Sequence, residues 1–202
     1  GIFKILGIKE NELISSSKNK HIAADQIICL DHPWYHKGII QDQVKKIPRW
    51  IILVNRKIFL NKAKKVKIMK KIFLDRSSSK FNHCQIYNQK EVNKWIKKNK
   101  IKSYKPEKLS LEKQIYLFNK ASIILGAHGA AFTNIIFCKP GTKVIEIIPA
   151  DHPNRKCERI SKILKLKYFR ITTKPDNINK SFPYRIHLEK KHLKMINKVI
   201  NL

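Results

Sequence analysis

Strand-length apolar runs alternate with helix-period segments along most of this chain, and this alternation constrains the fold more than any other feature. From about residue 66 onward, we predict strands over residues 67–76, 101–104, 122–126, 143–148 and 168–172. We predict helices over residues 88–99, 110–121, 130–138, 154–166 and 187–200. Such alternation is typical of a parallel sheet with crossover helices on both faces. The sequence therefore predicts an α/β fold with a Rossmann-like parallel sheet.

Two of these helices begin at polar residues that can cap them. Asn88 precedes the first, with Glu91 three residues later, in the pattern of a capping box. Ser110 precedes the second, in which Leu111, Ile115 and Phe118 fall on one face. We expect both helices to start at these positions.

The first 65 residues follow a different pattern. Helix and strand remnants are expected before residue 38, and a helical stretch over residues 41–64 contains Pro48, which should kink or restart it. We interpret residues 1–38 as the remnant of a preceding N-terminal lobe with a linker. Residues 39–202 are predicted to form one Rossmann-like lobe. The glycine at residue 1 suggests a cut inside a longer chain.

The chain is strongly basic, with 44 lysine and arginine residues against 14 aspartate and glutamate residues and a formal net charge of +30. This excess raises two possibilities, nucleic-acid binding and association with an anionic membrane surface. However, only seven of the basic residues are arginine, the side chain that favours phosphate and base recognition, and lysine is spread along the whole chain. We therefore expect a solvated lysine surface and no specific nucleic-acid partner.

The spacing of the cysteines and the hydropathy of the chain bear on its redox compartment and on whether it could span a membrane. Cys29, Cys84, Cys138 and Cys157 form no Cys-x-x-Cys pair, so the sequence predicts neither a zinc site nor a disulfide framework. Free thiols fit a reducing compartment. No apolar run approaches the ~18 residues that a membrane-spanning helix needs. We expect a cytoplasmic protein, and peripheral contact with the membrane through the basic surface stays open.

The uncharged stretch ASIILGAHGAAFTNIIF, residues 121–137, contains a candidate binding turn. In a doubly wound sheet, the carboxyl ends of the strands open onto the ligand crevice, where a glycine-rich turn lets backbone N–H groups approach a phosphate. Gly126, Gly129 and Ala130 would form this turn. Thr133 and Asn134, in the first turns of the following helix, could donate further hydrogen bonds.

Three ionisable residues are predicted to lie beside this turn. His128 lies within it, at the lip of the crevice. Glu146 lies on the next predicted strand, where a buried carboxylate needs a cation, backbone donors or ligand hydroxyls. Arg76 ends the first strand at the same edge and could pair with a phosphate. Each feature has a structural alternative, namely tight strand–helix packing for the glycines and ordinary surface roles for the histidine and arginine.

Read together, the segments KIFLDRSSSKFNHCQIYNQKEV and LSLEKQIYLFNKASIILGAHGAAFTNIIFCKPGTKVIEIIP resemble the catalytic region of glycosyltransferase family 61, over about residues 40–172. That family includes protein O-linked N-acetylglucosaminyltransferases, plant xylosyltransferases and bacterial polysaccharide-biosynthesis relatives. The resemblance implies an inverting GT-B-type enzyme with two Rossmann-like lobes. This chain would be mainly the C-terminal lobe, which binds a nucleotide-sugar donor, with UDP as the expected nucleotide.

The resemblance also implies roles for individual residues. The catalytic residues would be His128 and Arg76, with Arg76 offsetting the charge of the leaving group. The donor-binding residues would be Gly129, Ala130, Thr133, Asn134, Glu146 and Asn88, with Glu146 holding the ribose or orienting the loop. Glu91 matches the family's glutamate near Asn88. Two departures are Cys84-Gln85, where basic residues are usual, and Ala131-Phe132, where Gly-Leu is usual.

No Asp-x-Asp motif occurs, and the resemblance implies no required metal or other cofactor. The expected partners are a nucleotide-sugar donor and a glycan, polysaccharide or protein acceptor. Two other readings stay open. One is a basic protein that binds nucleic acid or an anionic surface on a degenerate nucleotide-binding scaffold. The other is a nucleotide-dependent oxidoreductase, which is disfavoured because GAHGAA departs from G-x-G-x-x-G.

Overall fold

The computed structural model describes residues 2–28, 47–78, 83–152, 154–174 and 185–202. The α-helices are α1 (Ile2–Ile5), α3 (Arg49–Phe59), α4 (Gln89–Lys98), α5 (Leu111–Lys120), α6 (Lys156–Ile163) and α7 (Lys190–Asn201). The 3-10 helices are η1 (Glu10–Glu12), η2 (Leu60–Lys62), η3 (Pro106–Lys108) and η4 (Ala130–Phe137). The strands are β1 (Lys71–Leu74), β2 (Gln85–Ile86), β3 (Lys102–Tyr104), β4 (Ile123–Ala127), β5 (Lys143–Pro149), β6 (Lys167–Thr173) and β7 (Arg185–Ile186).

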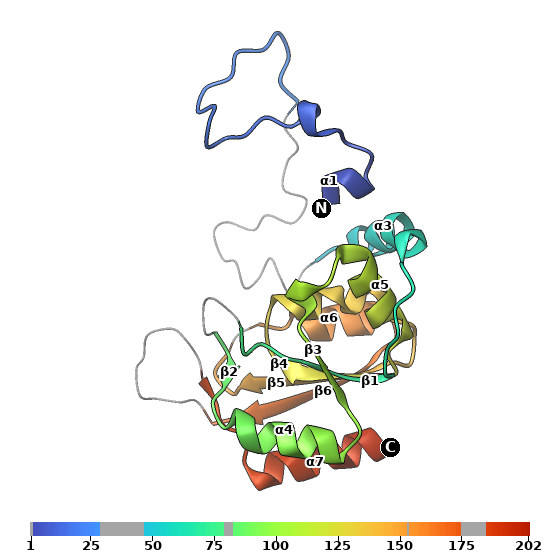
Figure 1. Cartoon of the computed structure of the whole chain (residues 1–202), viewed down its shortest axis with the longest axis vertical. Helices are drawn as coiled ribbons and strands as arrows, with labels where there is room; N and C mark the ends of the chain where they lie inside the picture. Colours follow the sequence, from blue (N-terminus) through green and yellow to red (C-terminus); the bar gives the residue numbers. More distant parts are fainter. Residues whose placement is uncertain (1, 29–46, 79–82, 153, 175–184) are drawn as a thin grey trace.

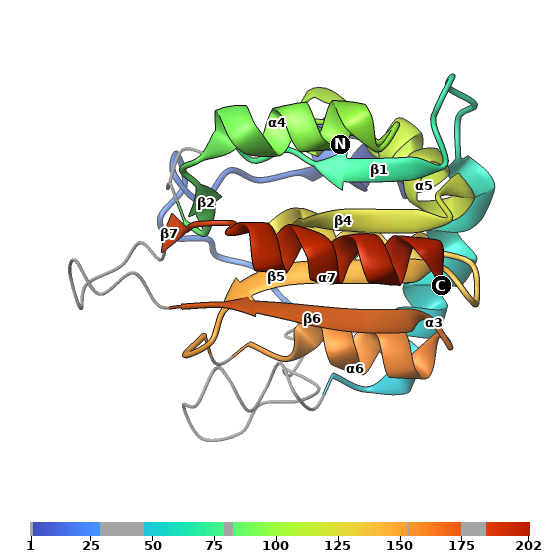
Figure 2. The same ribbon diagram turned by 90° about the horizontal axis from the view of Figure 1, so that it is seen from below.

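Five of the strands form one parallel sheet in the order β3-β1-β4-β5-β6. Figure 2 shows β1, β4, β5 and β6 in this order. All five were predicted from the sequence, and the predicted parallel α/β sheet is confirmed. The chain runs from β1 outward to β3 and then returns to β4 on the other side of β1. In doubly wound sheets, such a reversal opens a crevice at the carboxyl ends of the two central strands. The switch point of this sheet therefore lies between the ends of β1 and β4.

Helices cover both faces of the sheet, as predicted (Figure 1). Helices α3, α5 and α6, together with η4, pack on one face around Phe118, Phe132 and Val144. Helices α4 and α7 pack on the other face around Ile145 and Ile196. Neighbouring residues of a strand point to opposite faces, so Val144 and Ile145 enter different cores. Strands that are apolar on both faces must lie between two helix layers.

The helix predicted over residues 130–138 is present as the 3-10 helix η4. Its buried residues are Phe132, Ile135 and Phe137, and the buried Cys138 follows as the C-cap residue. A 3-10 helix has three residues per turn, so Phe132 and Ile135 lie on the same face of it. The backbone N–H of Phe132 donates to the carbonyl of Gly129, and that of Cys138 donates to Ile135. The side chains of Phe132 and Ile135 both pack in the core with Phe118 and Val144.

The predicted capping box at Asn88 does not form, although α4 does begin beside it. The Asn88 amide instead binds the backbone of Leu188, donating from Nδ2 to its carbonyl at 3.0 Å and accepting its N–H at Oδ1 at 3.1 Å. Nδ2 also donates to Glu91 Oε2 at 2.9 Å. The Asn88 side chain thus binds the backbone of Leu188, far away in the sequence, instead of the N–H groups at the start of α4. By contrast, Ser110 caps α5 as predicted, accepting from the N–H of Lys113 at 3.4 Å.

These contacts of Asn88 predict a mainly structural effect of its replacement. Asn88→Ala would leave the N–H and the carbonyl of Leu188 without this partner, and we expect a loss of about 1–3 kcal/mol of unfolding free energy. Urea unfolding measures this change, and Gln89→Ala on the neighbouring helix position is the control. Normal stability combined with loss of nucleotide binding would contradict the structural role.

The N-terminal described residues, 2–28, contain α1 and η1, with no strand and no buried side chain. The predicted strand remnants are therefore wrong within this range. Helix α3 begins at Arg49, directly after Pro48, so the proline starts a helix here because it lacks the N–H that a helix interior requires. The predicted boundary at residue 38 and the helical stretch over 41–46 lie outside the described residues.

Within the described ranges, no helix combines the length and apolar character needed to cross a membrane. Cys84, Cys138 and Cys157 are free thiols and are buried, as predicted. Cys29 lies outside the described residues. The sequence did not predict the two-residue strands β2 and β7, which pair in parallel through Gln85–Ile86 and Arg185–Ile186. Strands this short leave no periodic pattern to recognise.

Candidate active site at the carboxyl edge of the sheet

A buried contact between a histidine and a carboxylate lies at the carboxyl end of β4. Nδ1 of His128, directly after β4, lies 2.6 Å from Oε1 of Glu146, on β5. Both residues are buried, with 5% and 1% of their surfaces exposed. The backbone N–H of His128 also donates to the carbonyl of Ile147 on the neighbouring strand. The predicted proximity of His128 and Glu146 is therefore present in the structure.

Glu146 has partners at both carboxylate oxygens. Oε2 accepts a hydrogen bond from the Tyr168 hydroxyl of β6 at 2.6 Å, while Oε1 faces His128. Burial raises the pKa of Glu146, but hydrogen bonds from His128, Tyr168 and the thiol of Cys157 outweigh it and hold the pKa below its usual value. Glu146 is thus an ionised, enclosed carboxylate. Its carboxylate connects the residue after β4 with Tyr168 of β6 and Cys157 of α6.

This arrangement orients the imidazole of His128. An ionised carboxylate accepts only, so Nδ1 of His128 must donate to Glu146. In the neutral ring, the lone pair then lies on Nε2, on the opposite side from Glu146. A carboxylate that fixes a histidine tautomer in this way is a common feature of sites that use the second ring nitrogen as a base or as a donor.

Two further histidines surround His128. The ring centroids of His152 and His83 lie 4.4 Å and 6.2 Å from that of His128. Nε2 of His152 lies 3.3 Å from Nε2 of His83, and Nδ1 of His152 accepts the backbone N–H of Asn154 at 3.2 Å. Because Nδ1 accepts, a neutral His152 carries its hydrogen on Nε2 and donates it to His83. The three rings form one connected cluster.

The His152 ring predicts a pH dependence of stability. Burial, reinforced by His128 and His83, lowers the pKa of His152 from 6.5 to about 4. The unfolded chain then binds more protons than the folded chain between these values, so stability is fully present above pH 6.5 and is lost as the pH falls toward 4. Melting temperatures should fall between pH 7.5 and 5, and less steeply for His152→Gln. An equally steep fall in the variant would contradict this assignment.

Arg76 completes the cluster from the end of β1. Its Nη2 donates to the carbonyl of His83 at 3.0 Å. A Cβ atom built on Gly129 would lie 1.4 Å from Nη1 of Arg76, so the guanidinium occupies the space that any other side chain at position 129 would take. Gly129 is therefore required by a close approach. Arg76, Gly129 and His128 meet at the switch point between β1 and β4.

The other predicted donor-binding residues divide into two groups. Thr133 is exposed on η4 and accepts a hydrogen bond at Oγ1 from Nζ of Lys156, at 2.9 Å, and Ala130 is exposed beside it. Asn134 instead donates to Oε1 of Gln114 on α5 at 2.8 Å. Gly126 lies within β4, where a Cβ would come within 2.9 Å of the Leu74 Cβ. Thr133 and Ala130 thus remain at the edge, whereas Asn134 and Gly126 contact other parts of the fold.

Two groups of potential metal ligands lie in this region, namely His83, Cys84 and His152, and His128, Glu146 and Cys157. In the first group, Nε2 of His152 carries a hydrogen where a metal needs a lone pair. Burial also raises the pKa of Cys84 to about 12, so its sulfur is a thiol near neutral pH. In the second group, both oxygens of Glu146 already accept hydrogen bonds. These contacts favour a hydrogen-bond network over metal ligation.

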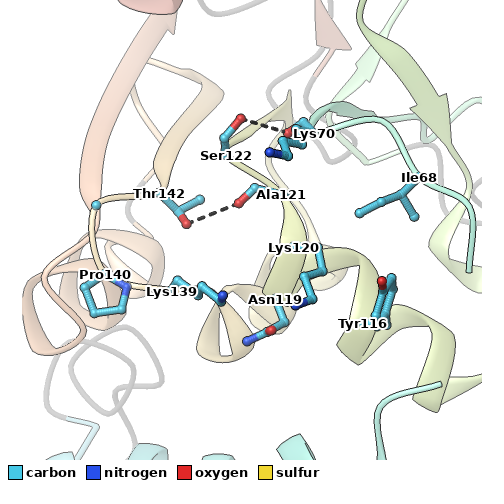
Figure 3. A pocket seen from close by; sticks show the side chains of 11 residues that line it. Ile68, Lys70, Tyr116, Asn119, Lys120, Ala121, Ser122, Lys139, Pro140 and Thr142 are labelled. Atoms are coloured by element: carbon cyan, nitrogen blue, oxygen red, sulfur yellow. Dashed lines mark hydrogen bonds between the residues drawn. The ribbon is translucent and has the colours of Figure 1, made fainter. Parts of the chain in front are cut away.

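Two surface depressions lie away from this cluster. One, of about 710 Å³, is at the amino ends of β4 and β5 and is lined by Lys70, Tyr116 and Lys139, among others (Figure 3). The second, of about 630 Å³, lies between α1, η2 and the start of α5. Both are lined by described residues, and neither contains a predicted site residue.

Sequence reasoning missed His83, His152 and Tyr168 as members of this site. His83 and His152 follow β1 and β5, so a search for ionisable residues after every predicted strand would have found them. Tyr168 carries no such signal because it lies inside β6, opposite Val144. Its hydroxyl reaches Glu146 only through the register of the two strands.

The fold and the cluster together define a doubly wound α/β protein with ionisable residues at its topological switch point. The chain belongs to glycosyltransferase family 61, whose family model matches residues 7–145. The resemblance recognised from the motifs is thereby confirmed. The match begins earlier and ends earlier than the predicted range of about 40–172.

Two plant enzymes are similar to part of the chain. A beta-1,2-xylosyltransferase of Arabidopsis thaliana is 37% identical over 60 residues, which cover 30% of this chain and 11% of that enzyme. A beta-1,2-xylosyltransferase of Oryza sativa subsp. japonica is 33% identical over 63 residues, which cover 31% of this chain and 12% of that enzyme. The matched segment is therefore a small part of both relatives.

Proposed function

We propose that this protein transfers a sugar from a nucleotide-sugar donor, of the UDP type, to a glycan, polysaccharide or protein acceptor with inversion at the sugar carbon. Residues 39–202 would form the donor lobe of a GT-B-type enzyme. Family membership supports the reaction class. The local similarity to two xylosyltransferases makes a pentose donor the first to test, with hexose donors next.

The observation that carries this proposal is the meeting of Arg76, Gly129 and His128 at the switch point of the sheet. A donor diphosphate placed there would face the Arg76 guanidinium and the N–H groups of Ala130 and Ala131, which precede Phe132, whose N–H donates to Gly129. Lys156, held at Thr133, would add a second cation. Charge stabilisation of this kind supplies most of the catalysis in many transfer reactions.

In the proposed reaction, an acceptor hydroxyl oxygen forms a bond to the sugar carbon while the bond from that carbon to the diphosphate breaks. The bonding electron pair leaves with the nucleoside diphosphate, and the hydroxyl proton passes to a base. Nε2 of His128, oriented by Glu146, is the proposed base, and contact with a donor phosphate is its alternative role. The His128 side chain is only 6% exposed, so an acceptor reaches it after the neighbouring rings of His83 and His152 shift.

We propose that transfer needs no metal, because Arg76 and Lys156 can offset the charge of the leaving diphosphate. Transfer should then persist in a chelator such as EDTA. Loss of activity in EDTA, restored by a divalent cation, would overturn this part of the proposal.

Thermal-shift measurements with a panel of UDP-sugars, including UDP-xylose and UDP-N-acetylglucosamine, test donor binding directly. A bound donor at about 100 times its Kd stabilises a protein by about 2.7 kcal/mol, which gives a clear rise in melting temperature. We expect Arg76→Ala to lose this rise and Arg185→Ala, an exposed arginine on β7, to keep it. A rise that survives in Arg76→Ala, or no rise with any donor, would count against the proposed site.

The donor lobe alone offers the acceptor no opposing wall, since a GT-B enzyme closes its site between two lobes. We therefore propose that residues 1–202 bind the donor but transfer sugar poorly, and that a longer chain containing a second lobe transfers it efficiently. Donor binding and transfer, measured side by side on both chains, test this. Efficient transfer by the 202-residue chain would show that no second lobe is needed.

A further inference from the structure

Lysines gather in two rows on the helix layer formed by α4 and α7. Lys90, Lys94 and Lys98 follow one another at four-residue spacing on α4. On α7, the corresponding row consists of Lys190, Lys194 and Lys198. Residues four apart lie on one side of a helix, and all six lysines are exposed. Lysines that are scattered along the sequence are thus aligned in rows on the surface of these two helices.

Both rows point away from the sheet. The buried residues Val92 and Ile96 of α4 face the core, and Lys94 and Lys98 lie two positions further along, on the opposite side of the helix. On α7, Lys194 and Lys198 lie two positions before and two positions after the buried Ile196, again on the opposite side of the helix. The two helices cover the same face of the sheet in both views (Figures 1 and 2). The rows therefore form one basic layer, which we call the α4/α7 face.

Few groups on the α4/α7 face offset this charge. Helix α4 contains one carboxylate, Glu91, and the carboxylate before α7, Glu189, contacts Lys191 at 3.0 Å. Among the described residues, no ion pair includes any lysine of the two rows. Like charges four residues apart destabilise a helix. An external anionic surface would relieve this repulsion.

The chemistry of the face favours a membrane over a nucleic acid. Helices α4 and α7 contain eight lysines and no arginine, whereas base and phosphate recognition favours the planar, bidentate guanidinium. Lysine acts as a point charge, which suffices for attraction to anionic lipid headgroups. Met195 on α7 is 50% exposed beside Lys194 and adds an apolar side chain to the face. A layer of two helices on a sheet is also a broad surface, unlike a groove that follows a phosphate backbone.

We propose that the α4/α7 face docks the protein on a membrane surface rich in anionic phospholipids. The attraction is electrostatic and is therefore reversible and sensitive to salt. Helices α4 and α7 cover one face of the sheet, whereas His128 follows the carboxyl end of β4, so this docking leaves that edge at the side of the contact. The proposal is independent of the sugar-transfer reaction, because docking requires neither donor nor acceptor.

Vesicle co-sedimentation tests the proposal with the 202-residue chain. The probes are phosphatidylcholine vesicles with and without about 30% phosphatidylserine, at ionic strengths that place the Debye length at about 10 Å and about 3 Å. We expect binding only to the anionic vesicles and only at low salt. The test variant replaces Lys94, Lys98, Lys194 and Lys198 with glutamine. It should lower the partition coefficient on the order of 100-fold, since each lysine at the surface contributes several-fold.

A charge-matched control distinguishes the contribution of the α4/α7 face to vesicle binding from that of the overall net charge. It replaces four exposed lysines of the other helix layer with glutamine, namely Lys57, Lys113, Lys120 and Lys162. The control should bind anionic vesicles nearly as well as the original protein. Circular dichroism melting shows that both variants fold, because all eight side chains are exposed. Equal losses in the two variants would overturn the proposal, as diffuse charge would then explain binding. Tighter binding to a short DNA duplex than to vesicles at the same salt would also overturn it.

Discussion

Replacing Glu146 with alanine is expected to lower the free energy of unfolding by about 3–5 kcal/mol, because removing one partner of a buried ionic network leaves the others uncompensated. His128 and Tyr168 both direct hydrogens at this carboxylate at 2.6 Å, and Glu146 is 1% exposed. Urea unfolding at neutral pH measures the change. A loss below about 1 kcal/mol, typical of a surface substitution, would mean that the network contributes little to stability.

Two further variants define the origin of this effect. Glu158→Ala removes an exposed carboxylate that pairs with Arg155 at 3.5 Å, with 54% of the Glu158 side chain exposed, and should change stability by about 0–1 kcal/mol. Glu146→Gln keeps the shape of the side chain but removes its charge. We expect a smaller loss of stability. In the longer chain proposed above to transfer sugar efficiently, we also expect a drop in transfer, since an amide no longer fixes the tautomer of His128. Unchanged transfer in Glu146→Gln would contradict the orienting role.

Replacing Gly129 with alanine is expected to displace Arg76 and abolish donor binding. The new Cβ would overlap Nη1 of Arg76, at 1.4 Å, so the guanidinium must leave its position and its hydrogen bond to the His83 carbonyl. The arginine end is flexible, and we expect a stability cost of about 1–3 kcal/mol, in the range of other overpacked sites. The loss of the donor-induced thermal shift should be complete.

A double-mutant cycle attributes this effect to one contact. In an Arg76→Ala background, the overlap is absent, and Gly129→Ala should then cost little stability. The coupling energy between the two positions is expected to be at least about 1 kcal/mol, well above the additivity error of about 0.3–0.5 kcal/mol. Additive effects would show that the backbone at position 129, and not Arg76, requires glycine. The extended backbone of Gly129, with φ 167° and ψ 179°, argues against that alternative.

The parallel sheet could be predicted because its strands are buried on both faces. Residues 123–127 and 143–149 are apolar runs with few interruptions, the pattern that parallel strands between two helix layers require. Where a tertiary contact competes with a local signal, prediction failed. Asn88 binds Leu188 instead of capping α4.

Part of the candidate site also follows from the sequence. Parallel strands all present their carboxyl ends at one edge, so Arg76 after β1 and His128 after β4 had to lie near one another once the strands were recognised. Glu146 stood out because a carboxylate within an apolar strand needs partners. The sequence did not predict which residues would contact one another in the site. Tyr168 reaches Glu146 from another strand, and His152 reaches His83 from another loop.

The sequence by itself determined the α/β class, the strands that form the sheet and the edge at which the ionisable residues gather, because hydrophobic periodicity and strand direction are local properties of the chain. Only the tertiary structure decided which residues touch. It placed Arg76 in the space left by the missing side chain of Gly129, enclosed Glu146 between His128 and Tyr168, and arranged scattered lysines into the α4/α7 face. The physical reason is that these contacts join residues far apart in the chain, and their distances depend on strand register and helix packing.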